Sequence, residues 1–256
     1  MIPLTVTIIT RNEEKNIARC LASVAWADEI VVVDSFSDDR TPSICREFGC
    51  RLLTTDWRGF GRTKQFAVDA ATHDWIFSID ADEEVTPELR QALQEMMTTV
   101  PCQAGYRIKR QSYYLGRLIR HSGWNRDYPL RLFDRRRGRF KDVLVHESVT
   151  VAGRAGKIEA PLLHYTYPTL TSHLEKINHY TSLAAQELVR QGRRSSTPAA
   201  VAKGGLKFLK MYILQRGFLD GREGWILAIV SAFGIMLKYL KLAELSRGPS
   251  VADPPE

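Results

Sequence analysis

The sequence of 256 residues is poor in cysteine and lacks several patterns that mark other classes of protein. Its four cysteines show no paired spacing of the kind that zinc ligands have, so no metal-binding finger or ribbon is expected. A chain of this length can bury a core without disulfides, and we expect reduced, buried thiols and a cytosolic location. The N-terminus has no basic segment and no cleavage site, so no secretory signal is expected.

Three further absences narrow the possible functions. The first expected strand ends in Thr-Arg-Asn-Glu rather than in a glycine-rich turn, which disfavours a dinucleotide-dependent oxidoreductase. No recognisable nucleic-acid-binding motif accompanies the basic residues, so nucleic acid is not an expected partner. The longest apolar run, Trp225 to Leu237, is shorter than the roughly 20 residues that an ordinary transmembrane helix needs.

Charge is distributed unevenly along the chain, whose formal net charge is +7. Residues 1–100 contain 10 Lys and Arg against 17 Asp and Glu, whereas residues 101–256 contain 26 against 12. We interpret this asymmetry as a cation site in the first half and an anionic acceptor or membrane surface bound by the second half. A solvated surface explains the same counts.

The first hundred residues alternate four times between a short apolar strand and a helix. The strands are expected at residues 4–9, 29–34, 50–53 and 75–79. Such alternation predicts a mostly parallel α/β sheet with right-handed crossovers and helices on both faces. Ligands of these sheets bind beyond the carboxyl ends of the strands, which are polar in this sequence. Short β segments are expected between residues 105 and 167.

Asp80-Ala81-Asp82, directly after the fourth expected strand, is the motif with the most specific chemistry. In an extended backbone, residues i and i+2 project to the same side, so the two carboxylates can share one hard cation. Mg²⁺ or Mn²⁺ prefers oxygen ligands and is completed by waters and substrate phosphates. In sugar transfer such a cation neutralises charge on the leaving diphosphate. Asp34 ends the second strand and is expected at the same edge of the sheet.

Four segments of the first half resemble family 2 inverting glycosyltransferases, which have the GT-A fold. They are Thr10-Arg-Asn-Glu-Glu14, Ile30 to Asp38, Gly61-Arg-Thr-Lys-Gln65 and Asp80-Ala-Asp-Glu-Glu84. Segments of the second half are similar to lipopolysaccharide inner-core β-1,4-glucosyltransferases that modify a heptose, namely Pro129 to Phe133, Val145-His-Glu147, and Phe218 through Leu242. The resemblance implies a UDP-sugar donor, with UDP-glucose expected, and Mg²⁺ or Mn²⁺ as cofactor.

The same resemblance implies roles for individual residues. Asp34 would accept a hydrogen bond from the uracil ring, and Lys64 would lie near the base or the diphosphate. Asp82 would be the firmer metal ligand, with Asp80 beside it. His146 could complete the metal shell or stabilise the diphosphate, although a structural role explains it equally. The residues expected to bind the donor are Thr10, Arg11, Glu13, Asp34, Lys64, Asp80, Ala81 and Asp82.

Inversion requires a base that deprotonates the acceptor hydroxyl as it attacks the anomeric carbon. This carboxylate must lie across the sugar from the metal, so we expect it in the second half of the chain. We predict Glu147, because His146-Glu147 matches the motif of the family and lies in a short polar break between apolar segments. Asp127 is the second choice. The acids available between residues 101 and 170 are Asp127, Asp134, Asp142, Glu147 and Glu159.

The remaining basic and apolar segments each allow two interpretations. The run Arg135 to Arg139, with Arg126, Arg131 and Lys141, could receive phosphates of an anionic lipid-linked acceptor, although a solvated turn explains it equally. After an expected linker at Ser195–Pro198, residues 206–214 and 225–237 are apolar and flanked by lysines and aromatic residues. This pattern suits a helix in the lipid headgroup region, and it also suits a helical hairpin packed on the catalytic domain.

The expected organisation is a GT-A catalytic domain over residues 1–168, with a nucleotide-sugar-binding half at 1–100 and an acceptor half at 101–168. A helical, membrane-associating region at 169–248 and a flexible tail at 249–256 would follow. The expected activity is hexose transfer to a heptose of a lipid A–core or other anionic glycolipid. The enzyme would be peripheral on the inner face of the cytoplasmic membrane. Transfer to polyprenyl phosphate or to a protein, and a non-catalytic nucleotide-binding module, are the alternatives.

Overall fold

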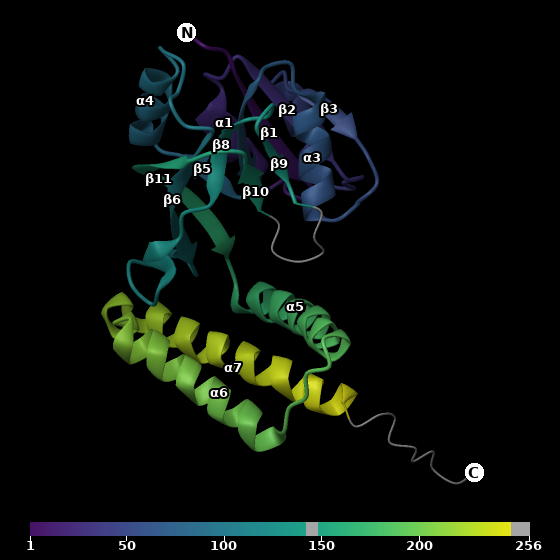
Figure 1. The fold of residues 1–256 in the computed structure, drawn as a ribbon, viewed down its shortest axis with the longest axis vertical. Helices are drawn as coiled ribbons and strands as arrows, with labels where there is room; N and C mark the ends of the chain where they lie inside the picture. The colour runs from purple at the N-terminus through teal and green to yellow at the C-terminus, as the bar shows by residue number, and fades with distance from the viewer. Residues whose placement is uncertain (142–147, 247–256) are drawn as a thin grey trace, which may run out of the picture. The chain divides into compact units, whose positions relative to one another are not determined.

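A computed structural model describes residues 1–141 and 148–246 of the chain (Figure 1). These residues form two compact units. Unit 1 contains residues 1–111 and 126–165, and unit 2 contains residues 112–125 and the residues that follow 165. Residues 112–125, which we expected in the acceptor half, group with the C-terminal helices in unit 2. The expected tail at 249–256 lies outside the described residues.

Unit 1 begins with the predicted alternation of strands and helices. The parallel strands lie in the order β3-β2-β1-β4, and β1 is buried along its whole length because helices cover both faces of the sheet. The elements are β1 (Leu4–Thr10), α1 (Ile17–Val24), β2 (Glu29–Asp34), α2 (Thr41–Glu47), β3 (Arg51–Thr54), α3 (Phe60–Ala70), β4 (Trp75–Asp80), β5 (Glu83–Val85) and α4 (Pro87–Met96).

The second half of unit 1 extends the sheet with antiparallel strands. Among the described residues, the path of the sheet is β3-β2-β1-β4-β8-β6-β11-β5, with β7 paired to β6, and β9 and β10 form a separate hairpin. The first half thus contributes both the parallel core and, through β5, the far edge. These elements are β6 (Gly105–Tyr114), β8 (Leu130–Asp134), β9 (Gly138–Phe140), β10 (Val149–Val151) and β11 (Ala155–Tyr167). The last residues of β6 and β11, together with β7 (Arg117–Leu118) and most of η1 (Trp124–Arg126), belong to unit 2.

The core of unit 1 is apolar, as the sequence pattern predicts. Helix α1 buries Ile17, Cys20, Leu21 and Val24, whose spacing of three and four residues places them on one helical face. The cysteines are free thiols. Burial raises the pKa of the Cys45 thiol to about 12, so this sulfur packs as a small apolar side chain at neutral pH.

Unit 2 is mainly helical and contains α5 (Leu170–Arg190), α6 (Thr197–Leu209), a π-helical turn η2 (Lys210–Leu214), a 3₁₀ turn η3 (Gly217–Asp220) and α7 (Gly221–Leu245). In Figure 1, α6 and α7 lie side by side as an antiparallel hairpin, and α7 also packs on α5. The linker expected at Ser195–Pro198 is wrong in part, because Ser196 Oγ caps α6 and Thr197-Pro198 forms its first turn.

Two buried polar contacts hold segment 112–125 to the helices within unit 2. Tyr114 Oη lies 2.9 Å from His173 Nδ1, and the His173 ring stacks on Tyr167 at 4.0 Å between centroids. The carboxylate of Asp220 accepts hydrogen bonds from the backbone N–H groups of Arg120 and His121, each at 3.0 Å. Asp220 therefore fixes a loop that lies about a hundred residues earlier in the chain.

Candidate functional site

The carboxyl ends of β1, β2 and β4 lie together at one edge of the sheet. The strand register places Thr10 opposite Asp34, and Ile9 opposite Asp80. The loops after β1 and β2 are joined by hydrogen bonds from Asn12 N to Ser37 Oγ (2.8 Å) and from Glu13 N to Thr41 Oγ1 (2.8 Å). This edge therefore has a preformed polar surface where a ligand of an α/β sheet is expected.

Asp34 and two hydroxyl groups form the buried part of this edge. Asp34 is 3% exposed, and its carboxylate accepts hydrogen bonds from the backbone N–H (2.9 Å) and the hydroxyl (2.5 Å) of Ser37. The hydroxyls of Thr10 and Ser35 are buried and have no hydrogen-bond partner among the described residues. Because an unpaired buried hydroxyl costs about 1–3 kcal/mol, the two groups fit a polar ligand that would satisfy them.

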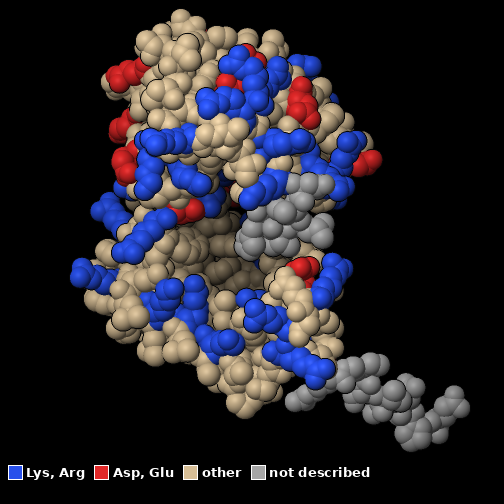
Figure 2. All heavy atoms as spheres, viewed as in Figure 1, with Lys and Arg blue, Asp and Glu red and all other residues tan. Residues whose placement is uncertain are grey.

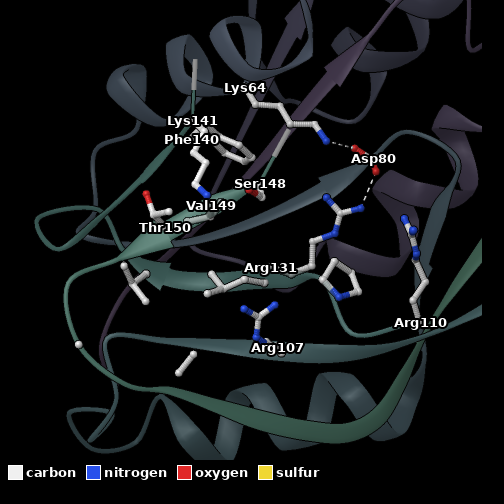
Figure 3. A pocket seen from close by; sticks show the side chains of 15 residues that line it. Lys64, Asp80, Arg107, Arg110, Arg131, Phe140, Lys141, Ser148, Val149 and Thr150 are labelled. Carbon is white, nitrogen blue, oxygen red and sulfur yellow. Dashed lines mark hydrogen bonds and ion pairs between the residues drawn. The ribbon is translucent and has the colours of Figure 1, made fainter. Parts of the chain in front are cut away.

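The carboxylate of Asp80 is bound by two cations, one on each oxygen. Lys64 Nζ lies 2.7 Å from Oδ1, and Arg131 Nη2 lies 2.5 Å from Oδ2 (Figure 3). Burial alone would raise the pKa of the Asp80 carboxyl. The charges of Arg131 and Lys64 outweigh this effect and hold the pKa well below its usual value. Asp80 is therefore ionised at neutral pH and fixed in position.

The ion pairs continue from Asp80 through a buried glutamate. Glu83 is fully buried and accepts from Arg131 Nη2 at 2.6 Å and from Arg110 Nη1 at 3.2 Å. Arg110 in turn pairs with Asp127, with its Nη2 2.6 Å from Oδ2. The carboxylates raise the pKa of the Arg131 and Arg110 guanidinium groups, against the effect of burial. We call the following six residues the charge cluster: Lys64, Arg110, Arg131, Asp80, Glu83 and Asp127.

Asp82 pairs with a histidine that lies near the C-terminal end of the sequence of unit 1. His164, on β11, lies opposite Glu83 in the strand register, and its Nε2 is 3.3 Å from Asp82 Oδ2. Both side chains are about one-sixth exposed, at 15% for His164 and 17% for Asp82. Two ligands at adjacent octahedral positions of Mg²⁺ or Mn²⁺ would lie about 3 Å apart, so this pair fits one divalent cation. No group of three such ligands occurs among the described residues, so waters and substrate would complete the shell.

A cavity of about 890 Å³ opens beside the charge cluster. Figure 3 shows Arg131 and Lys64 directed toward Asp80 on one side, with Arg107 and Lys141 on other parts of the wall. Among the described residues, the wall contains five cations against one carboxylate, that of Asp80; the cations are Lys64, Arg107, Arg110, Arg131 and Lys141. The Nε atom of Arg131 is buried and has no hydrogen-bond partner among the described residues. The cavity is therefore large enough for a sugar nucleotide and carries the charge that suits phosphates.

A comparison with protein families identifies the chain. The model of the family described as "Glycosyl transferase family 2" matches residues 5–155, which is more than half of the chain. The chain belongs to glycosyl transferase family 2. This confirms the resemblance stated from the sequence and identifies the protein as a glycosyltransferase.

Two curated relatives resemble this glycosyltransferase over nearly its full length. The lipopolysaccharide core biosynthesis glycosyltransferase LpsC of Rhizobium meliloti is 30% identical, over 98% of this chain and 97% of LpsC. An uncharacterised glycosyltransferase of Rickettsia typhi is also 30% identical, over 95% of this chain and 87% of the relative. Among solved structures, residues 1–349 of S. aureus TarS match with a TM-score of 0.50 and 16% identity, covering 96% and 92% of the two chains. The GT-A fold expected from the sequence is confirmed.

The structure gathers most of the residues predicted to bind the donor of this glycosyltransferase. Thr10, Asp34, Asp80 and Asp82 all lie at the carboxyl ends of β1, β2 and β4, and Lys64 reaches Asp80 from α3. Arg11 is exposed, Glu13 accepts from Asn16 Nδ2 at 2.8 Å, and Ala81 is buried. Because both Asp80 oxygens are already paired with cations, Asp82 is the better placed of the two predicted carboxylate ligands.

Of the two candidates for the catalytic base, Asp127 lies within the described residues and Glu147 does not. Glu147 and His146 lie outside the described residues, and so does Asp142. Asp127 is described: its side chain is 41% exposed, and its Oδ2 accepts from Nε (2.8 Å) and Nη2 (2.6 Å) of Arg110. The predictions for both candidates stay predictions.

The basic run expected to receive acceptor phosphates is occupied by contacts within unit 1. Arg135 donates to the carbonyl of Ala71 at 2.5 Å, Arg136 pairs with Asp134 at 2.7 Å, and Arg137 donates to the carbonyl of Ala152 at 3.0 Å. Arg131, also assigned to that role, is 5% exposed and belongs to the charge cluster. These contacts stabilise the fold, and they do not test whether the same residues also bind acceptor phosphates, so that interpretation stays a prediction.

Sequence reasoning missed three residues of the site. His164, Glu83 and Arg110 reach it through the antiparallel pairing of β11 with β5 and of β6 with β8. For His164 the available signal was a histidine directly after the predicted strand residues Pro161-Leu-Leu. No local pattern indicated that Glu83 is buried, since it follows two acids in sequence.

Proposed function

We propose that this glycosyltransferase moves a hexose, glucose from UDP-glucose, to a heptose of the lipopolysaccharide inner core, with inversion and with Mg²⁺ or Mn²⁺ as cofactor. The observation that carries the proposal is the Asp82–His164 pair at the carboxyl end of β4. It lies next to Asp80, whose two cationic partners line the large cavity.

The uridine part of the donor would bind at the ends of β1 and β2. Asp34 is held by two hydrogen bonds from Ser37, and it can accept a further one from the uracil N–H. The buried hydroxyls of Thr10 and Ser35 would find partners in the bound nucleotide. S. aureus TarS, which has a similar fold, has been solved in complex with UDP-GlcNAc.

The divalent cation would be held by Asp82 and His164. When bound, it supplies positive charge to the leaving diphosphate. A backbone hydrogen bond fixes the position of this pair. Tyr165 N donates to the backbone carbonyl of Asp82 at 2.9 Å, which joins β11 to the turn after β4. Arg131 and Lys64 hold Asp80 nearby and add two fixed cations on the side of the cavity.

The acceptor would enter the cavity with its hydroxyl directed at the anomeric carbon. Glu147 is the proposed base that removes the proton of this hydroxyl, with Asp127 as the second candidate. LpsC is described as a lipopolysaccharide core biosynthesis enzyme, which supports an acceptor of that class. Arg107 and Lys141 line the cavity without belonging to the charge cluster, so they can bind anionic groups of the acceptor.

The test of activity is the release of UDP from a panel of UDP-sugars, with lipid A–core, polyprenyl phosphate or a peptide as acceptor. UDP-glucose with the lipid A–core acceptor should turn over in Mg²⁺ or Mn²⁺ and stop with EDTA. Binding of UDP without turnover on any acceptor would identify a non-catalytic module and contradict the proposal. Glu147→Gln should retain donor binding and lose transfer, whereas the exposed Glu159→Gln should behave as the wild type.

The test of the metal site needs no turnover. Mn²⁺ binding in the presence of UDP, followed by electron paramagnetic resonance, should weaken at least about tenfold in Asp82→Asn and in His164→Asn. His179→Asn, an exposed histidine on α5, is the matched control and should bind Mn²⁺ normally. Unchanged Mn²⁺ affinity in both site variants would exclude this pair as the metal site.

A further inference from the structure

Unit 2 has an exposed aromatic cluster at the turn between α6 and α7. The rings of Phe208 and Tyr212 stack at 5.4 Å between centroids, and Trp225 meets them edge-on at 5.2 and 4.9 Å. Phe218 contacts Tyr212 at 6.2 Å. The side chain of Phe218 is nevertheless 47% exposed, and that of Trp225 is 45% exposed. Phe208 and Tyr212 are partly buried against the core of unit 2, whereas much of Phe218 and Trp225 faces solvent.

Aliphatic side chains extend this apolar surface. Leu209 and Ile213 are spaced four residues apart and lie on one helical face, and both are about half exposed. Leu214 is 78% exposed, and Leu219 is 50% exposed. A scattered exposed leucine needs no explanation, whereas a continuous apolar patch marks an interaction site. We call these residues the docking face: Phe208, Leu209, Tyr212, Ile213, Leu214, Phe218, Leu219 and Trp225.

The charges around the docking face are almost all positive. Figure 2 shows many Lys and Arg side chains over this part of the molecule and few acidic ones. Residues 197–225 contain two acids: Asp220 is 3% exposed and bonded to backbone N–H groups, and Glu223, whose side chain is 19% exposed, lies 3.5 Å from Arg117. The cations of this segment are Lys203, Lys207, Lys210, Arg216 and Arg222, and all except the half-buried Lys207 are exposed.

The helix that follows the docking face is long and apolar, yet its neighbours argue against a membrane-spanning role. Residues Gly217–Leu245 have the length and hydropathy of a membrane span. However, α7 packs on α5, whose outer surface includes the exposed charges of Glu175 and Lys176. Lys241 Nζ of α7 also donates at 2.8 Å to the backbone carbonyl of Asn178 on α5. Because hydrocarbon would surround these polar groups if α7 crossed the bilayer, only one side of α7 can face lipid.

We propose that the docking face binds the surface of an anionic phospholipid bilayer, with α6 and α7 lying on the membrane rather than crossing it. Aromatic rings favour the headgroup level of a bilayer, and neighbouring Lys and Arg side chains bind lipid phosphates. A second copy of the chain fits less well, since an isologous contact would bring the same five cations together, and the nearby carboxylate of Glu223 is largely buried and already beside Arg117. The inference does not depend on the proposed transferase reaction.

The test is cosedimentation of the full chain with phospholipid vesicles, without donor or acceptor. Vesicles of equal parts phosphatidylcholine and phosphatidylglycerol should bind the protein at least tenfold more tightly than phosphatidylcholine alone, and high NaCl should reverse the difference. Leu214→Glu and Phe218→Glu should each weaken binding at least tenfold. Lys210→Gln should weaken it about fivefold, as expected for one cation at an anionic surface. Val100→Glu, which changes a 77% exposed apolar residue of unit 1, is the control and should bind normally.

Three results would overturn the inference. The first is equal binding of the wild type and the docking-face variants to anionic vesicles. The second is resistance of the vesicle-bound protein to extraction at alkaline pH, which would identify α7 as a membrane span. The third is a wild-type dimer in analytical ultracentrifugation that Leu214→Glu converts to a monomer, together with no vesicle binding, which would identify a second copy as the occupant.

Discussion

Glu83 provides the sharpest test of the electrostatic reasoning, because its charge is fully buried. Its carboxylate accepts from Arg131 at 2.6 Å, from Arg110 at 3.2 Å and from the backbone N–H of Asp80 at 2.8 Å. The charge cluster contains three cations and three carboxylates and is neutral as a whole. Glu83→Gln is nearly isosteric but leaves the cluster with three cations and two carboxylates, so one positive charge is no longer compensated. Breaking a buried ion pair in this way costs about 3–5 kcal/mol.

The measurement is native-state hydrogen exchange of peptides from β4 and β8, which report the stability of unit 1 independently of unit 2. A loss of 3–5 kcal/mol corresponds to a decrease in protection of roughly 150-fold to 4,000-fold. Adding Arg110→Gln to the variant restores the charge balance and leaves Asp127 at a solvated position, 41% exposed. The double variant should therefore recover at least half of the loss.

A change below about fivefold in Glu83→Gln would refute this reasoning, since the buried charge would then be compensated by water or by relaxation. A double variant less stable than Glu83→Gln would also contradict it. In that case the hydrogen bonds of Arg110, rather than the charge balance, would dominate. Donor binding gives a second check, because Arg131 should hold Asp80 less firmly and UDP affinity should fall together with the protection.

Three more predictions concern unit 2. Burial lowers the pKa of His173 to about 4 in the folded protein, against 6.5 in the unfolded chain. Between these two pH values the imidazole is protonated in the unfolded chain and neutral in the folded protein, so the free energy of unfolding falls as the pH decreases. We expect about 2 kcal/mol less stability at pH 5 than at pH 7.5 by urea unfolding, and His173→Gln should remove this difference. Asp220→Ala leaves the N–H groups of Arg120 and His121 unpaired and should cost about 2–4 kcal/mol in the same assay. Lys241→Met should lower the melting temperature of unit 2 through loss of its bonds to α5, at a cost of about 1–2 kcal/mol.

The local pattern of the sequence was sufficient for the parallel half of the fold and for its ligand edge. Alternating apolar strands and helices must form a parallel sheet, and parallel strands end at a common edge. Asp34 and Asp82 could therefore be placed together from their positions after two strands. The register found in the structure, with Thr10 opposite Asp34 and Ile9 opposite Asp80, confirms that placement.

The partners of these acids could not be read from local pattern, because they come from antiparallel strands whose register depends on long-range packing. Phe77 on β4 pairs with Leu132 on β8, and this register places the neighbouring Arg131 near Asp80. The same limit explains why His164 was missed and why the pairing of Arg131 with Asp80 was not predicted. Position in sequence does not show whether an arginine is exposed or buried.

The order of the elements and the strand ends at which acids gather follow from local sequence, because hydrophobic periodicity and turn residues act over a few neighbouring positions. The family followed from the resemblance of four short motifs at those strand ends and in α3. Which acids are paired with cations depends on packing between segments that are far apart in the chain. Asp80 is occupied by two cations, whereas Asp82 faces His164. Tertiary packing also decided how α7 is used, since one side of this apolar helix packs on α5 and α6 and the other stays exposed. Burial and charge pairing are properties of the packed chain, and they separate residues that look alike in sequence.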